Sequence, residues 1–449
     1  LLIDQKLHPA AFFDAMLIDE KPMKPVRLDD RTIRLELPRA VAAIEPYLYN
    51  VGVLPRHKLE AAYKKGELDK SWGLGATTAE FAVSGPFMLK EFVPGQRTIL
   101  ARNPNYWKKD TAGNSLPYLD ELVIEALSDA NTSALKFQQG ELDVLDDIRP
   151  ADYVTLKEKT GALNLRDLGP RLQTDFFWFN LNDGRDSTGK PLVDPVKRAW
   201  FTNLKFRQAM AHAIDRASII QNVLRGLGIP FRGVISPGNK NWFNETIPGY
   251  DYDLGKSQAL LQEAGFKLNG AALTDAGGHP VEFTLIVAEN VTLRKTMATM
   301  IQEDLAKLGI RVNVAPLEDS AFTDRYHNTL QYEAAIHGIS PTDTDPSTLL
   351  PVLKSGGQQR YWFLNQKQPA QDWEKELDRL MDEQAVETDV NKRREKFNAA
   401  QKIFAEQLPM IPLVVRNFVS GAKVQLGNYK AGMLPPRSLW NVDELYWKK

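Results

Sequence analysis

The stretch that decides the fold class is residues 281–316, VEFTLIVAENVTLRKTMATMIQEDLAKLGIRVNVAP. Residues 281–287 form an apolar run of strand length, and an apolar stripe at helical spacing follows them. Gly309 then ends the helix, and apolar residues alternate from 310 to 314 as in a second strand. A strand, a helix and a strand at this spacing predict a parallel pair with a right-handed crossover, and therefore an α/β lobe. The helical stripe consists of Leu293, Met297, Met300, Ile301, Leu305 and Leu308.

Similar patterns on both sides of this unit extend the prediction along the chain. Residues 32–37 alternate polar and apolar side chains, which predicts a half-buried strand that Pro38 ends. Amphipathic stripes predict further helices, and short apolar runs between turn residues predict further strands. These elements are helices over 206–214, 373–381 and 397–408 and strands over 86–92, 98–102, 122–126 and 412–415.

Length and composition limit the classes of protein. A chain of 449 residues exceeds what one hydrophobic core usually organises, so two or more lobes are expected. Lys and Arg number 56 against 57 Asp and Glu, which leaves no basic excess for nucleic acid. No apolar stretch reaches the roughly 18 residues of a membrane-spanning helix. Cysteine is absent, which excludes disulfides, thiolate zinc sites and cysteine nucleophiles.

The chain carries none of the common signatures of catalysis or cofactor binding. Gly249, Gly255 and Lys256 resemble a phosphate-binding loop, but five residues separate the glycines where that motif has four. We interpret this segment instead as the start of a helix capped by Asp253. The six histidines are scattered at spacings that fit no short metal motif. We therefore expect no catalytic residue, no metal site and no cofactor.

Eight short motifs in collinear order resemble landmarks of one protein family. Each motif is short, but together they span nearly the whole chain. The chain resembles the family five extracellular solute-binding proteins, which include dipeptide-, oligopeptide- and nickel-binding proteins. The motifs are residues 84–87 (SGPF), 102–107 (RNPNYW), 116–120 (LPYLD), 140–143 (GELD), 206–209 (FRQA), 213–216 (AIDR), 260–266 (LLQEAGF) and 409–413 (PMIPL).

The resemblance implies a two-lobed, periplasmic-binding-protein-like α/β fold of class II, with an extra subdomain inserted in the first lobe. The change in composition after the aromatic run 176–179 falls where the first crossover between lobes is expected. The expected domains are 1–79 as the remainder of the inserted subdomain, 80–179 as lobe 1, 180–415 as lobe 2 and 416–449 as the return to lobe 1.

The first residues lack an initiator methionine and show structure-like patterning almost at once. Segments that open the first lobe in the family are missing, so we expect the chain to be N-terminally truncated. The resemblance also implies export, to the periplasm or the cell surface, with a lipid anchor on the missing N-terminus as one option.

By the same resemblance, the protein is the substrate-binding component of an ABC-type importer and not an enzyme. The resemblance implies that it captures a small solute, most simply an oligopeptide, in the cleft between its lobes by hinge closure, and that it delivers the solute to a membrane permease. We expect a monomer. The alternatives are a binding protein for a sugar or a metal chelate and a sensory module of the same fold.

One departure from the family bears on the ligand. Peptide binders that this chain resembles hold the peptide amino terminus with an Asp three residues before an acidic-Pro pair. Here the pair begins at Asp345, the third residue before it is Thr342, and Asp343 stands one position away. This departure argues against strict dipeptide recognition and favours a longer peptide or a non-peptide ligand.

Five further ligand-binding candidates follow from their context in the motifs. Aromatic side chains beside a few polar groups are suited to hold a small ligand in a cleft. For Phe176 and Trp178, packing at the hinge is the alternative role. The candidates are Phe176, Trp178, His327, Gly338 and Phe418.

Overall fold

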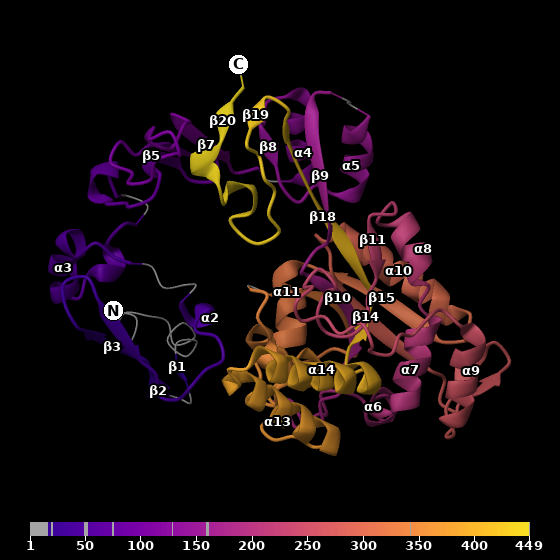
Figure 1. The fold of residues 1–449 in the computed structure, drawn as a ribbon. Helices are drawn as coiled ribbons and strands as arrows, with labels where there is room; N and C mark the ends of the chain where they lie inside the picture. The colour runs from indigo at the N-terminus through magenta and orange to yellow at the C-terminus, as the bar shows by residue number, and fades with distance from the viewer. Residues whose placement is uncertain are drawn as a thin grey trace. The chain divides into compact units, whose positions relative to one another are not determined.

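The protein divides into two compact units (Figure 1). Unit 1 comprises Leu1–Arg166 and Val419–Lys449, and unit 2 comprises Asp167–Phe418. The chain passes between them within strand β9 (Leu163–Pro170) and again within strand β18 (Val414–Lys423), and these strands pair with each other. The computed structural model describes residues 17–18, 21–48, 53–73, 76–127, 129–158, 161–341 and 343–448.

The two points at which the chain passes between the units differ from the expected domain boundaries, which lie after residues 179 and 415. Strand β10 (Thr174–Phe179), which was expected to close lobe 1, pairs with two strands of unit 2. The change in composition after residue 179 therefore marks the end of a strand within unit 2, because β10 leads there into a loop.

Unit 1 contains small antiparallel sheets. Strands β5 (Phe87–Val93), β6 (Arg97–Arg102) and β7 (Glu121–Glu125) pair in order, which confirms the three strands expected in this region. The predicted strand at 32–37 also forms, as β4 (Ile33–Glu36), which pairs with β3 (Lys24–Arg27). The remaining elements are β1 (Leu17–Ile18), β2 (Lys21–Pro22), α2 (Glu45–Leu48), α3 (Arg56–Lys65), α4 (Ala130–Gln139), β8 (Val144–Leu145), α5 (Pro150–Lys157), β19 (Leu426–Gly427), β20 (Tyr446–Trp447) and the short 3-10 helices η1 (Leu68–Lys70), η2 (Thr78–Glu80), η6 (Arg437–Leu439) and η7 (Val442–Glu444).

The predicted half-burial of β4 is wrong. Ile33 is 68% exposed and Leu35 is 38% exposed. Strand β4 belongs to a two-stranded ribbon, and such a ribbon provides little surface for its apolar side chains to pack against.

Unit 2 is built around a five-stranded sheet in the order β15-β14-β16-β10-β17. Strand β14 (Glu282–Ala288), helix α10 (Thr292–Ala306) and strand β15 (Arg311–Leu317) confirm the strand, helix and strand predicted over 281–316. Strand β14 is parallel to β15 and to β16 (Ala334–Ile339), whereas β10 runs antiparallel to β16 and to β17 (Ile411–Pro412).

Helices and three short strands make up the rest of unit 2. The predicted stripes correspond to α7 (Leu204–Ala213), α13 (Asp372–Val386) and α14 (Val390–Gln407), and Figure 1 shows α13 and α14 side by side. The interpretation of Asp253 is also confirmed, since its carboxylate accepts the backbone N–H of Lys256 at 2.8 Å at the start of α9. The other elements are α6 (Pro195–Thr202), α8 (Arg216–Asn222), β11 (Gly228–Pro230), α9 (Leu254–Glu263), β12 (Lys267–Asn269), β13 (Ala272–Thr274), α11 (Asp319–Thr323), a π-helical turn η3 (Asp324–Asn328), and the short helices η4 (Pro346–Leu349), α12 (Leu350–Leu353) and η5 (Tyr361–Phe363).

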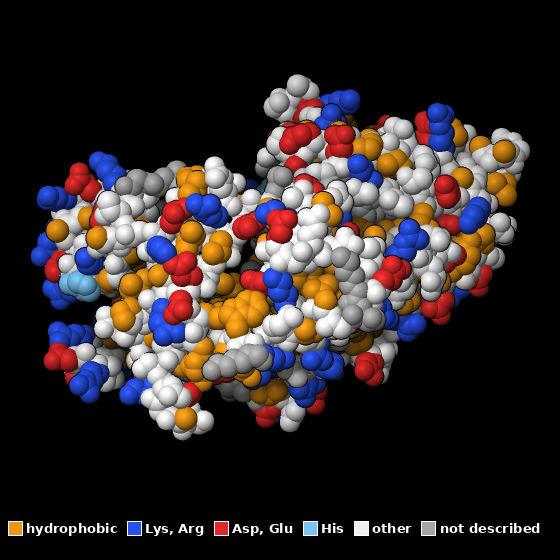
Figure 2. Space-filling model, turned by 90° about the horizontal axis from the view of Figure 1, so that it is seen from above, with side chains coloured by type: hydrophobic (Ala, Val, Ile, Leu, Met, Phe, Trp, Pro, Cys, Tyr) orange, Lys and Arg blue, Asp and Glu red, His pale blue; other side chains and the backbone are white. Residues whose placement is uncertain are grey.

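Charge on the surface is mixed. On the face shown in Figure 2, basic and acidic side chains are interspersed, without a broad area of one sign among the described residues. This pattern agrees with a net charge of -1.

A buried ion pair holds α13 in unit 2. Arg360 Nη2 donates to Glu374 Oε1 at 2.7 Å, and the two side chains are 0% and 4% exposed. The same carboxylate accepts the backbone N–H of Ala370 at 2.7 Å and that of Gln371 at 3.0 Å. Glu374 therefore neutralises a buried charge and also caps the first turn of α13.

We expect Glu374→Ala to lower the free energy of unfolding by about 3 to 5 kcal/mol, because it leaves the Arg360 guanidinium buried and unpaired. Urea unfolding measures this loss. The matched control is Glu376→Ala on the same helix, whose ion pair with Arg379 is exposed and contributes about 0 to 1 kcal/mol. Equal losses for the two variants would contradict a special role for the buried pair.

Candidate functional site

The candidate site lies at the carboxyl edge of the parallel strands of unit 2. Strands β14, β15 and β16 all end at this edge, and the antiparallel strand β10 begins there. Loops beyond the carboxyl ends of parallel strands are the usual place for ligands in α/β proteins. Helix α10 also begins at this edge, because it directly follows β14.

A buried arginine joins three elements at this edge. Arg294, in the first turn of α10, is 8% exposed. Its Nε donates to Asp175 Oδ1 on β10 at 2.8 Å, and its Nη1 lies 3.2 Å from His337 Nδ1 on β16. The guanidinium charge is thus balanced by the Asp175 carboxylate, and the pair holds helix and strands together.

Position 338 requires a glycine, because Arg294 and Asp175 lie too close to its backbone for a side chain to fit. A Cβ atom at this position would collide with Arg294 Nη2 and would lie 2.9 Å from both Asp175 Oδ1 and Gln173 Nε2. Gly338 is the direct partner of Asp175 across the β10–β16 ladder. The missing side chain therefore opens the space in which the guanidinium lies.

His337 is neutral at this site. Burial lowers its pKa to about 4, and the positive charge of Arg294 lowers it in the same direction. Arginine can only donate, so Nδ1 of His337 accepts the hydrogen bond and the neutral ring carries its proton on Nε2. The neutral histidine therefore has one N–H donor, on Nε2.

Aromatic rings surround His337. The Tyr326 ring lies 5.3 Å from the His337 ring and 5.2 Å from the Tyr361 ring, the second contact being edge to face. His327 contacts Tyr361 at 6.4 Å. Burial raises the pKa of Tyr326 and Tyr361, so both hydroxyls stay protonated. His327, His337 and Tyr361 are each partly exposed as residues.

The three candidates on the strands are buried side chains. Phe176 is 0% exposed and packs edge to face on Phe231 at 5.3 Å, and Phe418 on β18 is 2% exposed. Trp178 is 1% exposed, stacks on Tyr361 at 5.6 Å and donates from Nε1 to Tyr332 Oη at 3.0 Å. These positions favour packing, the alternative role for Phe176 and Trp178, and Trp178 supports the ring cluster through its contact with Tyr361.

The candidates after β16 separate into three cases. Thr342 lies outside the described residues. Asp343 Oδ1 accepts the backbone N–H of Asp345 at 2.9 Å. The Asp345 carboxylate receives Arg393 Nη1 at 2.7 Å and Nη2 at 2.6 Å, and it caps η4 through the backbone N–H of Ser347. Both carboxylates thus stabilise the loop and its attachment to α14.

The structure thus brings together the candidates His327 and Gly338 with residues that sequence reasoning missed. The missed residues are Asp175, Arg294, Tyr326, His337 and Tyr361. A signal existed for two of them: Arg294 is a basic residue just after a predicted strand, and Asp175 is the only charged residue in the run TDFFWF.

Two further searches of the described residues were negative. In these parts of the chain no three His, Asp or Glu side chains gather as a metal site would require. None of the described helices combines the length and the apolar composition needed to cross a bilayer.

The chain belongs to the bacterial extracellular solute-binding proteins, family 5, because the model of the middle region of that family matches residues 3–361. This confirms the family resemblance of the motifs. The fold agrees: the ABC transporter substrate-binding protein CtaP of Listeria monocytogenes superposes with a TM-score of 0.78 at 22% identity, covering 100% of this chain and 82% of that one. The predicted two-lobed α/β fold of such binding proteins is thus confirmed.

Three relatives illustrate the range of the family. A probable ABC transporter-binding protein of Deinococcus radiodurans is 31% identical over 69% of this chain and 53% of its own length. Heme-binding protein A of Haemophilus influenzae is 29% identical over 90% and 66%, respectively. The oligopeptide-binding protein AppA of Bacillus subtilis is 26% identical over 90% and 68%. The chain thus spans between about half and two thirds of the length of these relatives.

The depressed pKa of His337 predicts a loss of stability in acid. An unfolded histidine takes up its proton near pH 6.5, whereas folded His337 does so at about pH 4. Between these values the unfolded state binds more protons than the folded state. The stability that neutral His337 contributes to the fold is therefore complete above about pH 6.5 and is lost as the pH falls toward 4. We expect a loss of about 2 to 3 kcal/mol by about pH 4.5.

The measurement is urea unfolding of the protein and of His337→Asn, each at a pH above about 6.5 and at about pH 4.5. Asparagine keeps an acceptor for Arg294 but has no titrating group, so the variant should lose less stability on acidification. An identical pH dependence in the two proteins would exclude His337 as the cause.

Proposed function

We propose that this chain is the solute-binding component of an ABC-type importer and that it holds its ligand at the carboxyl edge of the unit 2 sheet. The observation that carries the proposal is the charge-balanced Arg294 beside partly exposed rings. Its Nη2 forms no hydrogen bond to any described residue and lies over Gly338, so it is a donor available to a ligand.

An oligopeptide suits these groups best. Peptide carbonyl and carboxylate oxygens accept hydrogen bonds, and Arg294 Nη2 and His337 Nε2 both donate. The rings of His327 and Tyr361 offer flat apolar contact, which holds peptide side chains without requiring one particular residue type. Binding through the backbone with loose side-chain contacts is what a general peptide importer needs.

A non-peptide ligand, such as a sugar or a metal chelate, is the second candidate. The carboxylates of Asp343 and Asp345 are engaged by the loop backbone and by Arg393, so neither is held ready for a peptide ammonium group. A ligand without a positive charge would not need them.

We infer that capture occurs by hinge closure about the two strand passages, which lie within β9 and β18. A ligand that binds the closed form more tightly shifts the equilibrium toward it, and the membrane permease would read that form. In this proposal the protein is exported to the periplasm or cell surface, acts as a monomer and catalyses no reaction.

Mass spectrometry of ligands that copurify, followed by calorimetry with the identified compounds and a peptide mixture, tests the proposal. Peptides should copurify and bind with one site per chain. A reproducible sugar or chelate would replace the peptide by the second candidate, and saturable turnover of a bound compound would overturn the non-enzymatic role.

Arg294→Lys tests the site itself. Lysine keeps the charge opposite Asp175 but loses the fork of donors, so we expect the dissociation constant of a carboxylate-bearing peptide to rise by about tenfold or more. Lys295→Met, the neighbouring residue on α10, is the matched control and should leave the affinity unchanged. If the two variants bind equally well, the ligand site lies elsewhere.

A further inference from the structure

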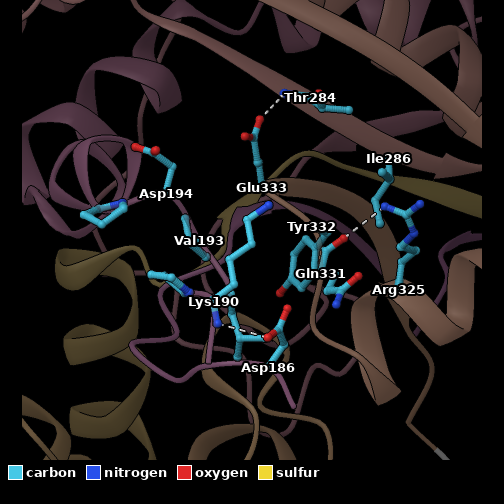
Figure 3. Close-up of a pocket in the computed structure, with 13 residues that line it drawn as sticks. Asp186, Lys190, Val193, Asp194, Thr284, Ile286, Arg325, Gln331, Tyr332 and Glu333 are labelled. Carbon is cyan, nitrogen blue, oxygen red and sulfur yellow. Dashed lines mark hydrogen bonds between the residues drawn. The ribbon is translucent and has the colours of Figure 1, made fainter. Parts of the chain in front are cut away.

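A pocket separate from the candidate site, which we call the second pocket, lies within unit 2 toward the opposite edge of the same sheet. It has a volume of about 550 Å³ and is drawn in Figure 3. Its lining includes Thr284 and Ile286 of β14 and Tyr332 and Glu333, which directly precede β16. The pocket is therefore placed toward the amino ends of the parallel strands, away from Arg294 and Gly338.

Two segments wall this pocket. The loop after β10 contributes residues from Asp186 to Pro195, and the segment that leads from η3 to β16 contributes Arg325 and residues 331–333. Asn180 ties the two segments together, because its Nδ2 donates to Leu330 O at 2.9 Å and to Tyr332 O at 3.0 Å. A buried amide thus fixes the shape of the pocket from beneath.

The carboxylates of the pocket are already engaged. Glu333 accepts Lys197 Nζ at 2.8 Å and the backbone N–H of Thr284 at 2.7 Å. Asp194 caps α6 by accepting the backbone N–H of Val196 at 2.9 Å. The third, Asp186, closes its own loop by accepting the hydroxyl and the backbone N–H of Thr188. These hydrogen bonds hold the walls of the pocket in place.

The two cations of the pocket remain available. Among the described residues neither Lys190 nor Arg325 forms an ion pair with a carboxylate within 4.0 Å. Within the described parts of the chain, the Arg325 side chain makes one hydrogen bond, a long one of 3.4 Å from Nη1 to Gln331 O. Figure 3 shows the Lys190 side chain extended into the pocket and the Arg325 guanidinium beside Ile286. The polar groups left for a ligand are therefore chiefly positive donors.

The rest of the lining is largely apolar. It is formed by Pro191, Leu192, Val193, Pro195 and Ile286, of which Val193 and Ile286 are buried. A ligand that fits such a lining has an apolar body, because contact with these side chains removes apolar surface from water. Its charged end must be an anion to meet Lys190 and Arg325.

We propose that this pocket binds a small amphipathic carboxylate, with its carboxylate held by Lys190 and Arg325 and its apolar body against Val193 and Ile286. The site is separate from the one at the carboxyl edge, and it does not depend on the proposed transport function. Nothing in the ligand needs to react, since binding rests on two charged donors and an apolar wall.

Hexanoate is the probe, and hexylamine and 1-hexanol are its matched analogues. Titration of the full chain by saturation-transfer NMR should give saturable hexanoate binding at least about tenfold tighter than that of either analogue. The double variant Lys190→Met/Arg325→Met should raise the hexanoate dissociation constant by about tenfold or more. Lys392→Met, an exposed lysine on α14, is the control and should bind as the parent protein does.

A thermal unfolding scan checks that the double variant is folded. Gln331→Trp is the second variant: Gln331 is exposed and lines the pocket, so an indole there should fill the space and abolish hexanoate binding without removing a core side chain. Absence of saturable hexanoate binding would overturn the proposal. So would hexylamine binding as tightly as hexanoate, or hexanoate affinity that survives in Gln331→Trp and the double variant.

Discussion

The burial of β10 on both faces of the unit 2 sheet is the constraint on which the rest of the unit depends. Its four consecutive rings, Phe176 to Phe179, are all 0% or 1% exposed. Each fully buried ring of this size is worth about 1.5 to 3 kcal/mol, and a slip by one residue would exchange the two faces. Helices on both sides are therefore required: Phe179 stacks on Phe201 of α6 at 4.5 Å, and Phe176 contacts Phe404 of α14 at 6.3 Å.

Because burial fixes the register of β10, it also fixes the positions of the residues at the two ends of the strand. Asp175, just inside one end, pairs with Arg294 and so sets the charge balance of the carboxyl edge. Asn180, just beyond the other end, is 0% exposed and holds the segment that walls the second pocket. The two edges consequently differ in electrostatics. At the carboxyl edge, the charge of Arg294 is balanced by the Asp175 carboxylate. At the opposite edge, the carboxylates are already hydrogen-bonded, and Lys190 and Arg325 line the pocket.

The sequence predicted well what depends on local pattern and poorly what depends on distant partners. The strand, helix and strand over 281–316 follow from periodicity alone and were predicted nearly to the residue. Asp345 was chosen as a ligand-binding residue for its place in the chain, but its carboxylate is shared with Arg393, which is 48 residues away and carries no local sign of the pairing. Asp175 and Arg294, 119 residues apart, were missed for the same reason.

Burial is the other property that local pattern could not supply. Alternation in 32–37 predicted a strand correctly, but whether a second layer covers it depends on elements elsewhere in the chain. For the aromatic residues 176–179 the sequence could not show whether the rings line a ligand site or pack a core, because the same residue types serve both roles. The helices that cover both faces of β10, α6 against Phe179 and α14 against Phe176, are what bury these rings.

The segment from η3 to β16 connects both sites. Within its π-helical turn, Arg325 faces the second pocket while the next residue, Tyr326, packs on His337. At its far end, Tyr332 lines the pocket and donates through its hydroxyl to Tyr361 O at 2.6 Å, beneath the ring cluster. A ligand that displaces this segment at one site must therefore move groups at the other. Any coupling carried in this way is reciprocal, because the same free energy links the two binding equilibria in both directions.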